Sequence, residues 1–101
     1  MTFPKFSYNA QSLGQLANSF NIKELYIFGS ALRRDFSDTS DIDLLVVFDK
    51  DTHYSLFDIM EIKAKFESFF GREVDLVEKD GLRNPYRKEA ILNSARQIYA
   101  A

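Results

Sequence analysis

Two aspartates near the middle of the chain are separated by a single residue. Asp41 and Asp43 flank Ile42 at the start of the apolar stretch from Ile42 to Phe48, which is typical of a β-strand. Side chains alternate across a strand and each residue rises about 3.3 Å, so the two carboxylates should leave one face within about 7 Å of each other. Carboxylates this close can share a divalent cation, and Mg²⁺ or Mn²⁺ suits oxygen ligands.

A third carboxylate could join this pair. Asp75 lies in another predicted strand, Glu73–Glu78, and can project from the same sheet face as Asp41 and Asp43. Three such carboxylates can hold two divalent ions about 4 Å apart. That arrangement stabilises the attacking and leaving oxygens of a phosphoryl or nucleotidyl transfer.

A Gly-Ser pair ends the earlier apolar run, Leu25 to Phe28. Gly29 and Ser30 are expected to open a short helical turn, where free backbone N–H groups and the small glycine let a phosphate approach. The Ser30 hydroxyl and the Arg33 guanidinium could reach the same anion. Each feature alone also has a structural explanation, because Asp-x-Asp and Gly-Ser pairs are common in turns and single charged side chains are usually solvated.

Composition excludes several kinds of chemistry. The chain has no cysteine and one histidine, His53, so thiolate metal sites, disulfides, thiol catalysis and a histidine-rich metal cage are absent. The net charge of −2 gives no bulk attraction to nucleic acid or to an anionic membrane. No apolar run is long enough to span a bilayer and no signal peptide is recognisable, so we expect a cytoplasmic protein.

The 101 residues predict a single domain over residues 1–101, of the α/β (α+β) class with a small central sheet and flanking helices. The elements that position the acidic residues follow from hydrophobic spacing and end signals. We expect, in order, a helix over 9–20 capped by Ser7 or Asn9, a strand over 25–28, a turn over 30–34, a loop over 35–40, a strand over 42–48, a helix from Ser55 to Gly71, a strand over 73–78 and a closing helix after Asn84-Pro85 whose apolar stripe runs from Ile91 to Tyr99.

The combination is more specific than its parts. Gly29-Ser30, ten further residues, Asp41-Ile42-Asp43 and a later strand aspartate, Asp75, resemble the DNA polymerase β-like nucleotidyltransferase superfamily. The strings IFGSALRRDFSDTSDIDLLVVF and GREVDLVEKDGLRNPYRKEAILNSARQIY are similar to the minimal nucleotidyltransferases, or MNT proteins, and the resemblance covers about residues 22–100.

This resemblance implies a polymerase β-like nucleotidyltransferase fold with a small mixed sheet. It also implies a metal-bound triphosphate, catalytic and metal-binding carboxylates at Asp41, Asp43 and Asp75, and phosphate contacts from Gly29 and Ser30, with Arg33 as a further nucleotide-binding candidate. Many MNT proteins are antitoxins of a HEPN-domain ribonuclease toxin. The resemblance therefore implies Mg²⁺-dependent transfer of AMP from ATP to a toxin tyrosine.

Two alternatives remain beside this hypothesis. The chain could neutralise its partner by stoichiometric binding, as part of an oligomer with that partner and without catalysis. It could also modify a small molecule, such as an aminoglycoside, or a nucleic-acid end. A chain of 101 residues has little room for a separate domain that binds a small-molecule acceptor, and its net negative charge does not favour a nucleic-acid acceptor. A protein acceptor is therefore favoured over a small molecule and over a nucleic-acid end.

Overall fold

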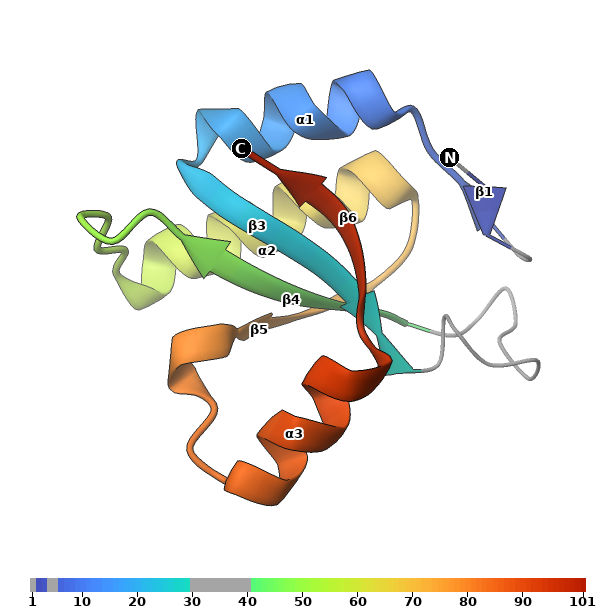
Figure 1. Ribbon diagram of the computed structural model, residues 1–101. Coiled ribbons are helices and arrows are strands. Elements are labelled where there is room, and N and C mark those ends of the chain that lie inside the picture. Colours follow the sequence, from blue (N-terminus) through green and yellow to red (C-terminus); the bar gives the residue numbers. More distant parts are fainter. Residues whose placement is uncertain (1, 4–5, 30–40) are drawn as a thin grey trace.

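The computed structural model describes residues 2–3, 6–29 and 41–101. Helices and strands alternate along most of this length (Figure 1). The elements are β1 (Thr2–Phe3), β2 (Phe6–Ser7), α1 (Ala10–Ser19), β3 (Ile22–Phe28), β4 (Ile42–Phe48), α2 (Leu56–Phe70), β5 (Val74–Glu78), the 3₁₀ turn η2 (Lys79–Gly81), α3 (Pro85–Ser94) and β6 (Arg96–Ala100).

The central sheet is mixed and has the strand order β5-β4-β3-β6. Strand β4 pairs in parallel with β5, while β3 pairs antiparallel with both β4 and β6. β1 and β2 form a separate two-stranded sheet. The predicted class, a small mixed sheet with flanking helices, is confirmed, and the apolar strand β4 lies in the interior of the sheet as its composition indicates.

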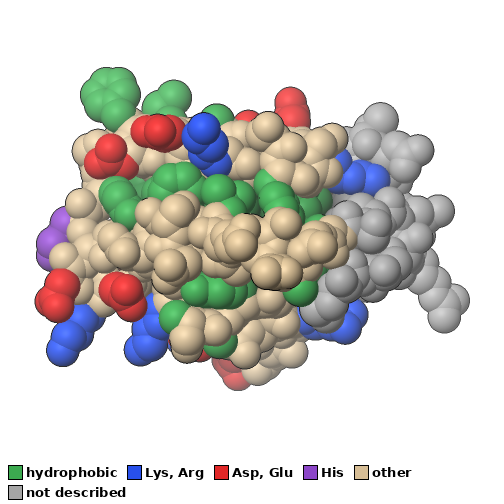
Figure 2. Space-filling model, turned by 90° about the horizontal axis from the view of Figure 1, so that it is seen from above, with side chains coloured by type: hydrophobic (Ala, Val, Ile, Leu, Met, Phe, Trp, Pro, Cys, Tyr) green, Lys and Arg blue, Asp and Glu red, His purple; other side chains and the backbone are tan. Residues whose placement is uncertain are grey.

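Each face of the sheet has its own helical cover and its own core. Helices α1 and α2 pack on one face, and α3 packs on the other (Figure 1). Hydrophobic side chains fill the space between these layers (Figure 2). The α1/α2 face buries Leu13, Ala17, Leu25, Ile27, Ile42, Leu44, Val46, Ile62, Phe66 and Val74, whereas the α3 face buries Phe28, Leu45 and Ile91.

The start of each α-helix and the end of α2 carry the caps that the sequence predicts. Asn9 caps α1 by accepting a hydrogen bond from Ser12 N, and Ser55 with Asp58 forms a capping box at α2. Gly71 ends α2 in the left-handed conformation, and Asn84 caps α3. Among the described residues, none of the helices is both long enough and apolar enough to cross a membrane.

The C-terminal segment differs from the prediction. The closing helix ends at Ser94, and the residues that continued its apolar stripe, Ile98 and Tyr99, lie in β6. The chain leaves the helix at Ala95, whose ψ of 141° is extended, and then pairs with β3. Both side chains pack against the α1/α2 core, and this burial on the sheet outweighs their helical spacing. The spacing of a short apolar run does not distinguish a helix from a strand.

Two further strand assignments are refined. β3 begins at Ile22 rather than at Leu25, and the β1–β2 pair has no counterpart among the predicted elements. The turn and the loop predicted over residues 30–40 lie outside the described residues.

Glu67 connects the last turn of α2 to the first residue of β5. Its Oε2 accepts hydrogen bonds from the backbone N–H of Val74 at 3.0 Å and from Lys63 Nζ at 3.2 Å. These bonds favour the ionised carboxylate, and the Val74 N–H contributes most to lowering the pKa of Glu67 below its ordinary value of 4.5. Glu67 therefore helps to hold the strand that carries Asp75.

We expect Glu67→Ala to lower the Tm at about pH 7 and to have much less effect at about pH 3. A carboxylate whose pKa is lowered by folding stabilises the fold above its unfolded pKa, and this contribution is lost as the pH falls through the folded pKa. Thermal unfolding at both pH values measures the difference. Exposed Glu89, replaced by alanine, is the control, and an equal Tm loss at both pH values for Glu67→Ala would contradict the assignment.

Candidate active site

Asp43 and Asp75 lie side by side on adjacent strands. They are register partners in the parallel β4–β5 pair, so their Cα atoms are about 4.8 Å apart and their side chains leave the same face. That face is the α3 face, because Leu45 and Val77, two residues further along the same strands, belong to the core that α3 covers. Asp43 is half-buried and Asp75 is exposed, so one carboxylate borders the core and the other borders solvent.

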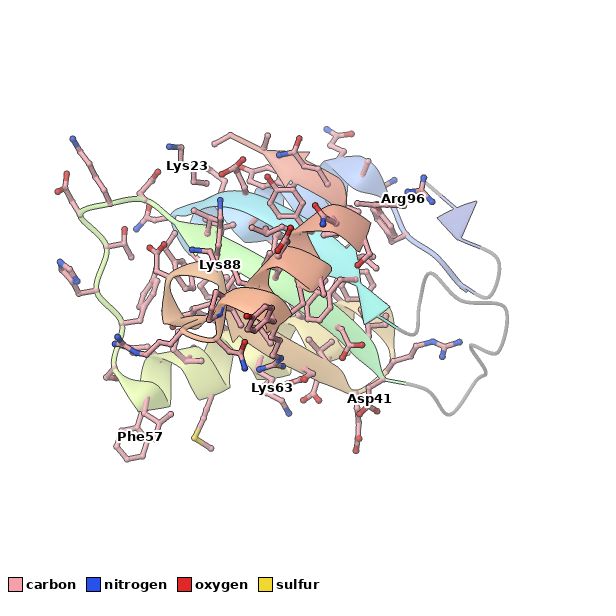
Figure 3. All side chains as sticks on the ribbon, turned by 60° about the horizontal axis from the view of Figure 1, so that its bottom comes forward. Lys23, Asp41, Phe57, Lys63, Lys88 and Arg96 are labelled. Carbon is pink, nitrogen blue, oxygen red and sulfur yellow. The ribbon has the colours of Figure 1, made fainter. Side chains whose placement is uncertain are left out.

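Asp41 lies at the same end of β4. It is exposed and directly precedes the strand, next to Ile42, whose N–H donates to the carbonyl oxygen of Glu73 at 2.9 Å. Figure 3 labels Asp41 at the edge of the sheet where the described chain resumes. The three predicted carboxylates thus belong to one end of the β4–β5 pair.

Gly29 makes room for Asp43. The glycine follows β3 with a φ of +73°, in the left-handed region that L side chains rarely adopt. A Cβ built on it would overlap the Asp43 carboxylate, with Oδ2 as the nearest atom and Cγ 3.2 Å away. The sequence predicts a phosphate contact for Gly29 but not this contact with Asp43, because nothing in the sequence pairs the end of β3 with residue 43.

Ser30 and Arg33 are the other two nucleotide ligands predicted from the sequence. Ser30 and Arg33 lie outside the described residues, so their roles remain predictions from the sequence.

Tyr26 lies further along the α3 face, on β3. Its hydroxyl donates to Glu24 Oε1 at 2.8 Å and accepts from Gln97 Nε2 at 3.2 Å. The hydrogen bond to the Glu24 carboxylate raises the pKa of Tyr26 above its ordinary value of 10.0, because it stabilises the protonated phenol. Tyr26 is therefore a hydrogen-bond donor at neutral pH and not a base for the site.

The donor set suits a hard divalent cation. All three candidate ligands are carboxylates, and Asp43 and Asp75 are adjacent through the sheet register. Over residues 2–3, 6–29 and 41–101, however, no three His, Cys, Asp or Glu side chains are close enough together to hold an ion by themselves. The arrangement therefore fits an ion that takes some of its ligands from a bound triphosphate.

A pocket of about 250 Å³ lies at the opposite end of β4. Its lining includes Phe48, Asp49, His53, Glu78 and Asp80. Asp43 is near the start of β4, whereas these residues lie at or beyond the ends of β4 and β5. The pocket is therefore separate from the carboxylate pair.

Comparisons with known proteins agree with this geometry. The family model described as nucleotidyltransferase domain matches residues 10–98. A candidate protein adenylyltransferase of Methanocaldococcus jannaschii is 34% identical to this chain over 76 residues, which cover 75% of this chain and 76% of that protein.

Solved structures have the same fold. A candidate minimal nucleotidyltransferase superposes with a TM-score of 0.70 at 30% identity, covering 86% of each chain. A chain from the complex of the tri-AMPylated Shewanella oneidensis HEPN toxin with MNT antitoxin has a TM-score of 0.65 at 19% identity, covering 91% of this chain and 70% of that chain. The resemblance inferred from the Gly-Ser and Asp-x-Asp motifs is thereby confirmed. The protein belongs to the nucleotidyltransferase domain family, among its minimal nucleotidyltransferases.

Proposed function

We propose that the protein transfers AMP from ATP to a tyrosine of a HEPN-domain toxin and is the antitoxin of that toxin. The observation that carries the proposal is the Asp43–Asp75 pair at the start of β4 and β5, with Gly29 leaving space for Asp43. It is supported by the 34% identical relative, which is named as a protein adenylyltransferase. It is also supported by the complex in which one chain has the fold of this protein and the HEPN toxin carries AMP groups.

Asp41, Asp43 and Asp75 would hold Mg²⁺ or Mn²⁺ together with the triphosphate. When bound, the cation neutralises charge on the triphosphate and on the pyrophosphate that leaves. Gly29, Ser30 and Arg33 would bind phosphate oxygens through backbone N–H groups, a hydroxyl and a guanidinium. These assignments rest on the sequence motif and on the register of β4 and β5.

The reaction is an in-line displacement at the α-phosphorus of ATP. The tyrosine oxygen forms a bond to the α-phosphorus, the bond to the bridging oxygen breaks, and pyrophosphate leaves with that oxygen. Asp75 is exposed, so an incoming hydroxyl can reach it, and we assign it the proton that tyrosine loses. Asp43, which borders the core, is better suited to a fixed ligand role.

Intact mass spectrometry tests the transfer. The purified protein is incubated with Mg²⁺, ATP and a candidate HEPN partner, and both chains are weighed. We expect the partner to gain one or more AMP groups with the native protein and none with the Asp41→Asn/Asp43→Asn variant. A native protein that adds no mass to a partner with which it forms a stable complex would contradict the proposal.

The amount of antitoxin needed to silence the toxin separates catalysis from occlusion. A transferase turns over, so far less than one equivalent should abolish toxin activity once ATP and Mg²⁺ are present. Neutralisation that needs a full equivalent and does not depend on ATP would instead indicate an antitoxin that acts by binding.

A further inference from the structure

One tyrosine differs from the other four in its exposure. All five tyrosines of the chain lie among the described residues. Tyr8 is buried, and Tyr99 packs against the α1/α2 core. The hydroxyls of Tyr26 and Tyr54 donate hydrogen bonds within the fold. Tyr86, the second residue of α3, is 84% exposed, and in the described part of the chain its hydroxyl makes no hydrogen bond.

Basic residues surround this exposed tyrosine. Arg83 precedes it, and Arg87 and Lys88 follow it. Among the described residues, these three side chains make no ion pair. With three basic residues and one acidic residue, Glu89, the segment 83–89 carries a net charge of +2 in a chain whose net charge is −2.

The candidate active site has the opposite sign of charge. Its three carboxylates, those of Asp41, Asp43 and Asp75, belong to one end of the β4–β5 pair. Together with a bound triphosphate they carry more negative charge than two divalent cations and the predicted ligand Arg33 neutralise. Opposite charges steer two protein surfaces toward each other and disfavour other orientations. The surroundings of the exposed tyrosine therefore complement the site of another copy of the chain.

We propose that Tyr86 is a second acceptor of AMP, modified by the active site of another copy of this chain. The inference rests on the proposed function, because it uses the same site and the same reaction. The Tyr86 hydroxyl oxygen bonds to the α-phosphorus of ATP held by the second copy, and the bond from this phosphorus to the bridging oxygen breaks. Pyrophosphate leaves with that oxygen, and the phenolic proton passes to Asp75 of the second copy.

The fold places Tyr86 far from the carboxylates of its own chain. Asp43 and Asp75 lie at the start of β4 and β5, whereas α3 follows the other end of β5. The helix then runs back along the sheet, because β6, which follows it, starts beside the end of β3 (Figure 1). Eight residues of helix, about 12 Å, separate Tyr86 from Ser94 at the near end. The transfer therefore takes place between two copies.

Mixing two variants tests the transfer between copies. Tyr86→Phe keeps the site but lacks the acceptor hydroxyl, and a tagged Asp41→Asn/Asp43→Asn chain keeps the hydroxyl but lacks the site. With Mg²⁺ and ATP, neither variant alone should gain AMP, whereas the mixture should label the inactive chain. Intact mass identifies the labelled chain, and peptide mass spectrometry should locate the AMP on Tyr86. The rate of labelling should rise in proportion to the concentration of the active chain.

Matched variants with an intact site separate the acceptor from its surroundings. Tyr86→Phe should abolish the gain of AMP by the chain itself, whereas Tyr54→Phe, which removes a hydroxyl that is already hydrogen-bonded, should not. At low ionic strength, Arg87→Glu should slow this gain about 10-fold, because it weakens the attraction to the acidic site. Lys65→Glu makes the same change of charge on α2 and should alter the rate by less than about 2-fold.

Transfer to a HEPN partner, measured in parallel, separates this inference from the proposed function. Tyr86→Phe should modify the partner at the native rate, because it leaves the site intact. A native protein that labels the partner but gains no AMP itself at up to about 100 µM, where weak encounters are populated, would overturn this inference alone. AMP on another residue of the chain would do the same. A protein that labels neither the partner nor itself would contradict both.

Discussion

Replacing Asp43 with asparagine is expected to lower the rate of AMP transfer about 1,000-fold or more while the protein stays folded. Asparagine has nearly the same shape as aspartate, so the position beside Gly29 and Asp75 is retained. The substitution removes the negative charge that a divalent cation needs at this point. The transfer rate with labelled ATP and a thermal unfolding curve measure the two parts of the prediction.

Asp49, just beyond the other end of β4, offers a matched control. It is an exposed aspartate that follows the opposite end of β4, so Asp49→Asn should leave the transfer rate within about 2-fold of the native value. Binding of Mn²⁺ and ATP, followed by electron paramagnetic resonance, gives a readout that does not depend on an acceptor. It should weaken in Asp43→Asn and remain unchanged in Asp49→Asn. Full transfer activity in a folded Asp43→Asn protein would contradict the assignment of this carboxylate.

Gly29→Ala is expected to cost about 2 to 5 kcal/mol of stability and most of the transfer activity. Alanine at a φ of +73° costs about 1–2 kcal/mol by itself. The overlap of its Cβ with the Asp43 carboxylate adds the cost of overpacking, about 1–3 kcal/mol, unless Asp43 moves away. Chemical denaturation measures the first effect, and the AMP transfer rate measures the second.

Gly71 separates backbone strain from the collision. It has a φ of +69°, close to that of Gly29, but a Cβ there would meet no atom within 4 Å. Gly71→Ala should therefore cost only about 1–2 kcal/mol and leave the transfer rate unchanged. Shortening Asp43 to alanine should make the additional Gly29→Ala substitution nearly as mild as Gly71→Ala. Equal costs for Gly29→Ala with and without the Asp43 carboxylate would show that the overlap relaxes freely.

The sequence predicts the elements whose boundaries have local chemical signals. The capping box at Ser55, the glycine at residue 71 and the Asn84-Pro85 start of α3 each specify an end of a helix, and the structure has these ends. The end of α3 has no such signal, because Ala95 is compatible with a helix. Only pairing with β3 reveals that residues after Ser94 form a strand, and that pairing is a long-range interaction that local spacing does not encode.

The candidate site, like the fold, is only partly predictable from the sequence. The spacing of Asp41 and Asp43 predicts that their side chains leave the same face of one strand. Alternation predicts that Asp75 and Val77 lie on one face of another strand. The sequence does not indicate which strands are neighbours. The register that pairs Asp43 with Asp75 is therefore evident only in the folded structure. The same holds for the approach of Gly29 to Asp43 and for the Glu67 link between α2 and β5.

The close approach of Gly29 to Asp43 also has an evolutionary consequence. While the aspartate is present, a side chain at position 29 meets both an unfavourable φ and an occupied space, so the two positions are not free to vary independently. Once position 43 has lost its carboxylate, only the preference at positive φ remains. Asparagine, in addition to glycine, adopts this conformation more readily than most residues. A lineage that abandons catalysis should therefore change at position 43 first and at position 29 later. A homologue with a substituted position 29 but an intact Asp43 should be rare.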